Sequence, residues 1–191
     1  MKRRLVVAIT GASGTVIGIH LLKLLRSIDE VETHLIVSEA GRFTAQQEAG
    51  IKVGELKDLA DVVHEPSMIG ATLASGSYHH DGMLIVPCSI KTLSAVANSY
   101  SNDLISRAAD VSLKEGRPLL LCVRETPFHL GHLRLMTSVS EMGAVVFPPI
   151  PAFYTSAGSV DEQLTQLCGR MLQRIGVSNS WVEVWQGPKK G

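Results

Sequence analysis

The chain has 191 residues, 45% of them hydrophobic, and its 18 Lys and Arg residues balance 18 Asp and Glu residues to give a net charge of 0. This length and apolar content predict one globular domain with a substantial core. The neutral charge excludes the basic surface that nucleic-acid binding requires. No apolar run approaches the ~20 residues of a membrane span, and no leader-like segment opens the chain, so the composition indicates a cytoplasmic protein.

The segment that follows the first strand is the most informative one. An apolar run at 4–9 leads into a turn with Gly11 and Gly14, after which leucines and isoleucines recur at helical spacing. A strand, a glycine turn and a helix in this order present backbone N–H groups and the positive end of a helix dipole to an anion. The Ser13 hydroxyl adds another donor. The pattern is typical either of a site for a nucleotide or flavin phosphate or of a tight connection without a ligand.

Four later apolar runs predict further strands, at residues 31–37, 82–87, 118–123 and 144–148. Each run is followed by a helical or helix-starting segment, and each is rich in Val, Ile and Leu. Strands of this kind are typical of a parallel sheet that is buried on both faces. We therefore expect a single-domain, doubly wound α/β fold with helices on both faces of a parallel sheet.

Polar segments follow several of these strands, and ligands of such sheets bind beyond the carboxyl ends of the strands. Ser38 and Ser89 each precede a helix, where a serine caps the helix, binds a ligand or does both. Thr92 shares a helix face with Ser89. Arg124 offers a fork for a phosphate, and Glu125 offers a carboxyl group for proton transfer. The alternative interpretation of this last pair is an ordinary salt bridge.

Other polar side chains have an ordinary structural interpretation. Lys114 lies near a helix end and Arg170 lies within a helix, positions that are typical of solvated surface. Tyr154 follows a proline-rich loop. The three cysteines form no CxxC pair, which indicates reduced thiols rather than a disulfide framework or a zinc site; they are Cys88, Cys122 and Cys168.

A nicotinamide dehydrogenase fits this sequence poorly. The glycines stand at 11, 14 and 18 rather than in a GxGxxG pattern, and the second strand ends in Ser38 where such an enzyme offers a carboxylate to the ribose. No Tyr-x-x-x-Lys motif follows. A serine at this strand end suits a ribityl or phosphate group, which favours FMN.

Taken together, these segments resemble the UbiX family of flavin prenyltransferases, in particular its branch associated with phenolic and aromatic acid decarboxylases. The resemblance covers nearly the whole chain. Its motifs are Thr-Gly-Ala-Ser-Gly at 10–14, Ser38, Glu48, Ala-Ser-Gly-Ser at 74–77, Pro-Cys-Ser-x-x-Thr-Leu at 87–93, Arg-Ala-Ala-Asp-Val at 107–111, Leu-Lys-Glu at 113–115, Arg-Glu-x-Pro at 124–127 and Pro-x-Phe-Tyr at 151–154.

The resemblance implies a Rossmann-like or flavodoxin-like fold, with an FMN-binding flavoprotein domain at 1–177 and a C-terminal arm at 178–191. It implies an enzyme that transfers a dimethylallyl group from dimethylallyl phosphate or diphosphate to N5 and C6 of reduced FMN. The product, prenylated FMN, would serve a UbiD-type decarboxylase. The family requires no metal and assembles as a homododecamer whose flavin sites lie between subunits.

The resemblance also assigns roles to single residues. The implied FMN-binding residues are Gly11, Ala12, Ser13, Ser38, Ser89, Ile90, Lys91, Thr92 and Arg124. The implied ligands of the donor phosphate are Lys114, Arg124, Tyr154 and Arg170. The implied catalytic residues are Ser13, Glu48, Lys114 and Glu125, of which Ser13 and Glu125 would manage protons.

The chain departs from the family pattern in two places. Residues 132–136 read His-Leu-Arg-Leu-Met where many members have His-Leu-Glu-Asn-Met, and 68–70 lack an aromatic residue that some members have. Two alternative functions stay open. One is an FMN-binding carrier or accessory subunit of an aromatic acid decarboxylase. The other is an FMN-dependent decarboxylase, although the Pro-x-Met-Asn motif expected of that class is missing.

Overall fold

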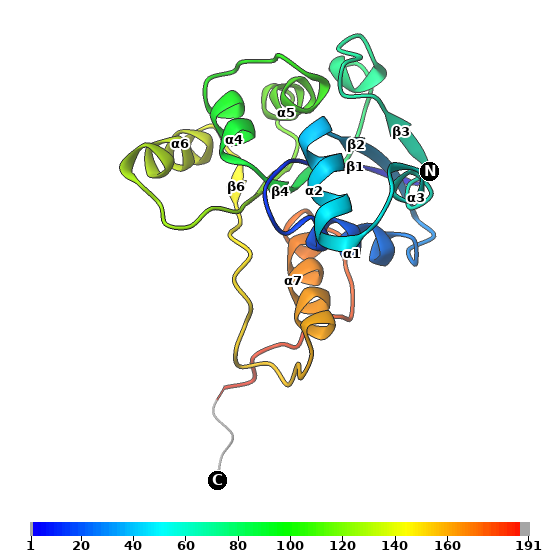
Figure 1. Cartoon of the computed structure of the whole chain (residues 1–191), viewed down its shortest axis with the longest axis vertical. Coiled ribbons are helices and arrows are strands. Elements are labelled where there is room, and N and C mark those ends of the chain that lie inside the picture. The colour runs from blue at the N-terminus through cyan, green and yellow to red at the C-terminus, as the bar shows by residue number, and fades with distance from the viewer. Residues whose placement is uncertain (1, 188–191) are drawn as a thin grey trace.

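A computed structural model describes residues 2–187 as a single parallel sheet between two layers of helices (Figure 1). The six strands are β1 (Arg3–Ile9), β2 (Val31–Val37), β3 (Val62–His64), β4 (Gly82–Cys88), β5 (Leu119–Val123) and β6 (Val145–Val146). Their order in the sheet is β3-β2-β1-β4-β5-β6, and every adjacent pair is parallel. The predicted doubly wound α/β fold is therefore confirmed.

Seven helices and one short 3₁₀ turn connect the strands within the described residues. They are α1 (Thr15–Leu25), α2 (Glu39–Ala49), α3 (Val53–Lys57), η1 (Thr72–Ala74), α4 (Ile90–Ala97), α5 (Leu104–Lys114), α6 (Leu130–Glu141) and α7 (Val160–Arg174). Side chains of α1 and α7 form one hydrophobic core with the sheet, and side chains of α4, α5 and α6 form the other. The strand order changes direction between β1 and β4, which is where ligands of doubly wound sheets bind.

Strand β1 shows why nearly continuous apolar runs are needed here. Leu5, Val7 and Ile9 face the core that contains α1 and α7, whereas Val6 and Ala8 face the core that contains α4 and α5. All five side chains have an exposed fraction of 0%. A central parallel strand has no solvent face, so alternation of polar and apolar residues disappears from its sequence.

Two strands differ from the prediction. The β3 strand was not predicted because it has only three residues, of which Val62 is exposed, and the chain then turns at Pro66. The β6 strand covers two residues of the predicted five because only Val145 and Val146 pair with β5. Both strands lie at the edges of the sheet, where pairing is one-sided and the hydrophobic pattern is weakest.

The segment predicted as a C-terminal arm lies against α7, and the structure describes it as far as Gly187. The Asn179 side chain donates to the Gly169 carbonyl over 3.0 Å, and Trp181 is packed against the core that contains α1 and α7. The Gly169 position has no room for a side chain, since a Cβ there would lie 2.8 Å from Val182. The arm is thus attached to its own chain, and its last residues, 188–191, lie outside the described part.

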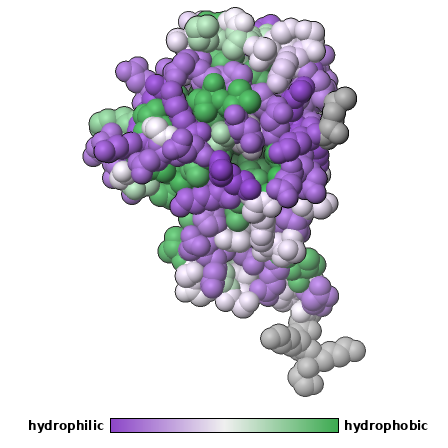
Figure 2. All heavy atoms as spheres, turned by 90° about the vertical axis from the view of Figure 1, so that its right-hand side faces the viewer, coloured by the Kyte–Doolittle hydropathy of each residue, from purple (hydrophilic) through white to green (hydrophobic). Residues whose placement is uncertain are grey.

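The face of the molecule seen in Figure 2 is mostly hydrophilic, whereas the three cysteine thiols are buried. Figure 2 shows a mostly hydrophilic face on which hydrophobic side chains form separate patches. Cys88, Cys122 and Cys168 are buried and unpaired by disulfides, and burial raises the pKa of Cys122 to about 12. Among residues 2–187, no helix is long and apolar enough to cross a bilayer.

Candidate active site

A cavity of about 820 Å³ opens beyond the carboxyl ends of β1, β2 and β4. Its walls come from the turn after β1, the start of α2, the segment after β3, helix α4 and the start of α5. The lining residues are Thr10, Gly11, Ser38, Glu39, Ala40, Phe43, Pro66, Ser67, Ser89, Lys91, Thr92, Ala95, Asn102, Asp103 and Ser106. Five members of the predicted FMN set are therefore brought together: Gly11, Ser38, Ser89, Lys91 and Thr92.

Two further cavities hold little of the predicted chemistry. One of about 290 Å³ lies at the opposite edge of the sheet and contains none of the predicted site residues. The other, of about 330 Å³, shares Lys91, Ala95 and Asn102 with the large cavity and extends it along α4 toward Tyr100. The large cavity at the change of strand order is therefore the candidate active site.

Thr10 fixes the turn after β1 to the end of β4. Its hydroxyl donates to the Pro87 carbonyl over 2.7 Å and accepts from the Ser89 backbone N–H over 2.9 Å. The side chain is 1% exposed, so water does not compete for these bonds. The Gly11 turn is also close to α2, because a Cβ on Gly11 would lie 2.4 Å from the Ala40 Cβ. The relative positions of the two ligand-facing turns are therefore set by direct contacts.

Ser38 and Ser89 both cap helices, as their positions predicted. Ser38 Oγ accepts from the Gly41 N–H over 3.0 Å at the start of α2, and Ser89 Oγ accepts from the Thr92 N–H over 3.3 Å at the start of α4. The Ser89 and Thr92 hydroxyls lie 3.1 Å apart. Accepting an N–H leaves the proton of the Ser38 hydroxyl available for a ligand. Capping and ligand binding are thus compatible at this site.

A carboxylate of the chain itself satisfies the N-terminus of α1. Glu48 of α2 accepts from the backbone N–H groups of Gly14 at 3.0 Å and Thr15 at 2.9 Å, and from the Thr15 hydroxyl at 2.7 Å. Gly14 is the capping residue of α1 and has no side chain to do this. The N–H groups left for a ligand in this turn are those nearer Gly11.

Hydrogen bonding also sets the charge of Glu48. Burial by itself raises the pKa of this carboxyl group, but hydrogen bonds from Ser13, Thr15 and the Gly14 backbone outweigh burial and hold the pKa below the ordinary value of 4.5. Glu48 is therefore ionised at neutral pH and fixes the orientation of Ser13.

Replacing Glu48 with glutamine is expected to lower the free energy of unfolding by about 1 kcal/mol at pH 7, the typical cost of losing a helix cap. A carboxyl group whose pKa is lowered on folding contributes stability above its unfolded pKa, and this contribution disappears as the pH falls through the folded pKa. Urea unfolding across pH 3 to 7 should therefore show wild type and variant converging at the acid end. The exposed Glu30→Gln variant is the matched control, and a pH-independent difference would contradict the cap.

Arg124 and Glu125 extend the site from the carboxyl end of β5. The Arg124 backbone N–H donates to the Cys88 carbonyl over 3.2 Å, which places the arginine next to Ser89. Within residues 2–187 the Arg124 guanidinium has no hydrogen-bond or ion-pair partner. Glu125 is half-buried, and its Oε1 accepts from the Thr126 N–H over 2.9 Å. Among the described residues the two form no salt bridge with each other, which was the alternative interpretation of this pair, so both side chains are available to ligands.

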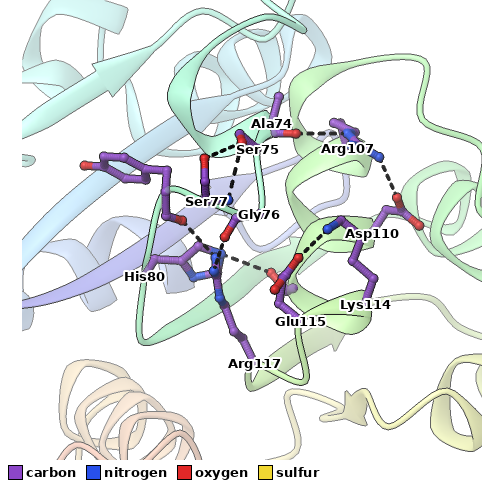
Figure 3. A network of polar contacts seen from close by, with 12 residues as sticks. Ala74, Ser75, Gly76, Ser77, His80, Arg107, Asp110, Lys114, Glu115 and Arg117 are labelled. Carbon is purple, nitrogen blue, oxygen red and sulfur yellow. Dashed lines mark hydrogen bonds and ion pairs between the residues drawn. The ribbon is translucent and has the colours of Figure 1, made fainter.

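Lys114 does not reach this site within its own chain. It ends α5 at the opposite edge of the sheet, about 12 Å along the helix axis from the cavity-lining Ser106. Figure 3 shows it forming an ion pair with Glu115 beside the 74–77 turn, where a Cβ on Gly76 would lie 2.7 Å from Lys114 Nζ. The predicted donor ligand Lys114 is therefore separated from Arg124.

Two arginines hold the 74–77 turn in place (Figure 3). Arg107 Nε donates to the Ala74 carbonyl over 3.1 Å and pairs with Asp110 at 2.8 Å. Arg117 donates to the Gly76 carbonyl over 2.6 Å and to the Tyr78 carbonyl over 2.9 Å. This turn and the end of α5 therefore form one fixed polar surface with Lys114 on it.

Tyr154 and Arg170 lie on a third part of the chain. The connection between β6 and α7 leaves the sheet and runs along the lower part of the molecule in Figure 1. On it, Tyr154 packs edge-on against Trp185 with ring centroids 5.5 Å apart. Arg170 of α7 is exposed and donates to Gln173 over 3.0 Å. The four predicted ligands of the donor phosphate thus occupy three separate regions of one chain.

Sequence reasoning missed several cavity residues as site residues. Thr10 belongs to the 10–14 motif but to no predicted ligand set, and Asn102 and Asp103 belong to no predicted set at all. Other missed lining residues include Phe43, Pro66 and Ser67. Pro66 and Ser67 follow a strand too short to be predicted, whereas the Asn-Asp pair before an apolar helix was a visible signal.

A doubly wound parallel sheet with a cavity at its change of strand order is typical of mononucleotide-binding α/β proteins. A model of the flavoprotein family matches residues 1–166. The chain is 50% identical over 187 residues to the flavin prenyltransferase UbiX of Salmonella typhimurium. The aligned residues cover 97% of this chain and 99% of that protein. The chain belongs to the flavoprotein family and, within it, to the UbiX flavin prenyltransferases.

Two solved structures support this assignment. The crystal structure of AnUbiX (PadA1) in complex with FMN and dimethylallyl pyrophosphate has a TM-score of 0.96 and 46% identity, covering 99% of this chain and 100% of that one. A dodecameric FMN-dependent UbiX-like decarboxylase from Escherichia coli O157:H7 has a TM-score of 0.93 and 41% identity, covering 96% and 100%.

Proposed function

We propose that this protein is a flavin prenyltransferase. It transfers the dimethylallyl group of dimethylallyl phosphate or diphosphate to N5 and C6 of reduced FMN, and its product, prenylated FMN, serves a UbiD-type decarboxylase in the cytoplasm. The observation that carries the proposal is the carboxyl-edge cavity, which collects five predicted FMN residues in a chain whose full-length relatives are UbiX flavin prenyltransferases.

The cavity residues fit FMN. The cavity volume of about 820 Å³ lies within the range of small-molecule sites. The free hydroxyl proton of Ser38, the Ser89–Thr92 pair and the unpaired Arg124 guanidinium supply donors for a phosphate and a polyol chain. Phe43 and Ala95 supply apolar wall for a flat ring system. Reduced FMN, when bound, supplies the nucleophilic nitrogen and ring carbon of the reaction.

Residues of this chain would manage charge and protons around those atoms. Arg124 would stabilise the negative charge that develops on the donor phosphate as the allylic C–O bond breaks and its electron pair leaves with the phosphate. Glu125 lies beside Arg124 and would accept a flavin proton and deliver one to the departing phosphate. Ser13, held by Glu48, would share in proton transfer.

The donor phosphate site would be completed between subunits. Lys114, Tyr154 and Arg170 do not lie with Arg124 in one chain, and an ion pair holds Lys114 on the surface of α5. Cations on separate surfaces meet when copies of the chain pack together, and we propose a homododecamer in which this happens. The UbiX-like relative from Escherichia coli O157:H7 is itself dodecameric.

Mixed assemblies are expected to reveal a shared donor site. Lys114→Met and Arg124→Met should each be inactive, but co-expressed chains should regain activity because about a quarter of randomly formed sites then receive both native residues. The measurement is product formation per protomer in purified hybrids. Simple mixing of preassembled variants without subunit exchange is the control. Hybrids as inactive as either variant would place both residues in one chain's site.

The proposed reaction is tested by its product. The purified protein is incubated anaerobically with reduced FMN and either dimethylallyl phosphate or diphosphate, and the released flavin is analysed by mass spectrometry. A gain of one five-carbon isoprenyl unit supports prenyl transfer and identifies the donor. Unchanged FMN with both donors, from protein that binds flavin, would favour a carrier of FMN instead.

A further inference from the structure

Asn102 and Asp103 line the candidate active site but belong to no residue set assigned so far. We propose that these two side chains bind FMN, Asp103 as an acceptor for a flavin hydrogen-bond donor and Asn102 as a neighbouring donor. Besides its phosphate, the hydrogen-bond donors that oxidised FMN offers are its ribityl hydroxyls and the N3–H of its ring system. This inference rests on the proposed function, because it concerns the same cavity.

A buried serine fixes the Asp103 side chain and lies close to Asn102. Ser106 is 3% exposed, and its backbone N–H and hydroxyl each donate to Asp103 Oδ1 over 2.8 Å. The same hydroxyl lies 3.4 Å from Asn102 Oδ1. The Asp103 backbone N–H lies 3.2 Å from Ser106 Oγ, which closes the capping box of α5. Asp103 is thus held in place before any ligand binds, with Asn102 beside it.

Each of the two side chains has one polar atom that is available to a ligand, Oδ2 of Asp103 and Nδ2 of Asn102. In the part of the chain that the structure describes, neither Asp103 Oδ2 nor Asn102 Nδ2 has a hydrogen-bond partner. The helix cap uses only Oδ1 of Asp103, so capping does not account for the second oxygen. An acceptor and a donor on adjacent residues match a hydroxyl group, which both donates and accepts.

The charge of Asp103 determines which part of FMN it faces. A carboxylate repels a phosphate group, so the phosphate must lie toward the donors around Gly11, Ser89 and Arg124 instead. The remaining polar groups of FMN are the ribityl hydroxyls and the polar edge of the ring, which carries N3–H. A hydrogen bond from either group to a charged acceptor is stronger than one to a neutral acceptor.

The test uses substitutions that preserve the helix cap. Serine and asparagine cap helices about as well as aspartate, so Asp103→Ser and Asp103→Asn should fold normally while removing the free carboxylate oxygen or its charge. We expect the dissociation constant of FMN, measured by flavin fluorescence, to rise about 10-fold or more in Asp103→Ser and less in Asp103→Asn. Asn102→Ala should raise it several-fold. Asp161→Ser removes an exposed carboxylate from the first turn of α7 and is the matched control.

Two flavin analogues identify the group that Asp103 binds. If Asp103 binds the ribityl chain, an FMN analogue with a hydroxyl-free pentyl chain binds wild type and Asp103→Ser equally. If Asp103 binds the N3–H of the ring, N3-methyl FMN binds wild type and Asp103→Ser equally. An effect of Asp103→Ser that persists with both analogues would overturn the proposal, because the residue would then act indirectly.

Failure of this inference is distinguishable from failure of the proposed function. If wild type binds FMN and both Asp103 variants bind it equally well, Asp103 is no flavin ligand and the prenyltransferase proposal is unaffected. If wild type binds no FMN, both proposals fall together.

Discussion

Replacing Glu125 with glutamine is expected to slow prenyl transfer by about 100- to 1000-fold, the usual contribution of a general acid or base. Glutamine has the same shape and can still accept the hydrogen bond from the Thr126 N–H, so the loop after β5 should keep its conformation. Its amide group cannot exchange a proton. The measurement is the rate of prenylated FMN formation at saturating donor, together with the dissociation constant of FMN.

Glu125→Gln is expected to lower the rate of prenyl transfer without weakening FMN binding. FMN affinity should stay within about 3-fold of wild type, since one uncharged substitution outside the cavity lining removes little binding energy. The exposed Glu141→Gln variant, at the end of α6, loses the same charge and should retain full activity. Turnover by Glu125→Gln within about 3-fold of wild type would remove Glu125 from the proton-transfer step.

Replacing Gly18 with alanine is expected to destabilise the fold by about 2 kcal/mol. A Cβ at this position would lie 2.2 Å from the Val86 carbonyl oxygen and 3.1 Å from Ile9 Cγ1, so α1 would have to move away from β4. Overpacking of this kind costs up to about 3 kcal/mol or more, which exceeds the gain of about 1 kcal/mol in helix propensity. Urea unfolding gives the comparison.

A second glycine provides the matched control for Gly18. In α3, a Cβ on Gly54 would have nothing within 4 Å, so Gly54→Ala should be neutral or stabilise the protein by up to about 1 kcal/mol. Because α1 carries the Gly11 turn at its start, Gly18→Ala should also weaken FMN binding. Equal stability of the two variants would mean that α1 does not lie against β4 as closely as described.

Local pattern predicted the central part of the fold. Runs rich in Val, Ile and Leu identified β1, β2, β4 and β5 because these strands are almost fully buried, and Ser38 and Ser89 identified the starts of α2 and α4. The short edge strand β3 gave no such signal. The capping of α1 by Glu48 was also beyond prediction from spacing, because its partners lie 33 and 34 residues away.

The candidate site also has a part that the sequence pattern predicted and a part that it did not. Gly11, Ser38, Ser89, Lys91 and Thr92 follow strand ends, and parallel strands bring their carboxyl ends to one edge, so the topology assembles these residues. The grouping of Lys114, Tyr154 and Arg170 with Arg124 came from family resemblance alone. Nothing in the topology of one chain joins them, which is the physical reason for proposing a site between subunits.

An enzyme differs from a carrier of flavin in that it turns over, so turnover is the most direct test of the proposed function. The protein is incubated anaerobically with a large molar excess of reduced FMN and the accepted dimethylallyl donor, and prenylated FMN is counted per protomer over time. We predict many product molecules per protomer, formed at a constant initial rate. Flavin that stays unmodified, or product that stops at one molecule per protomer, would contradict the assignment of this protein as a flavin prenyltransferase.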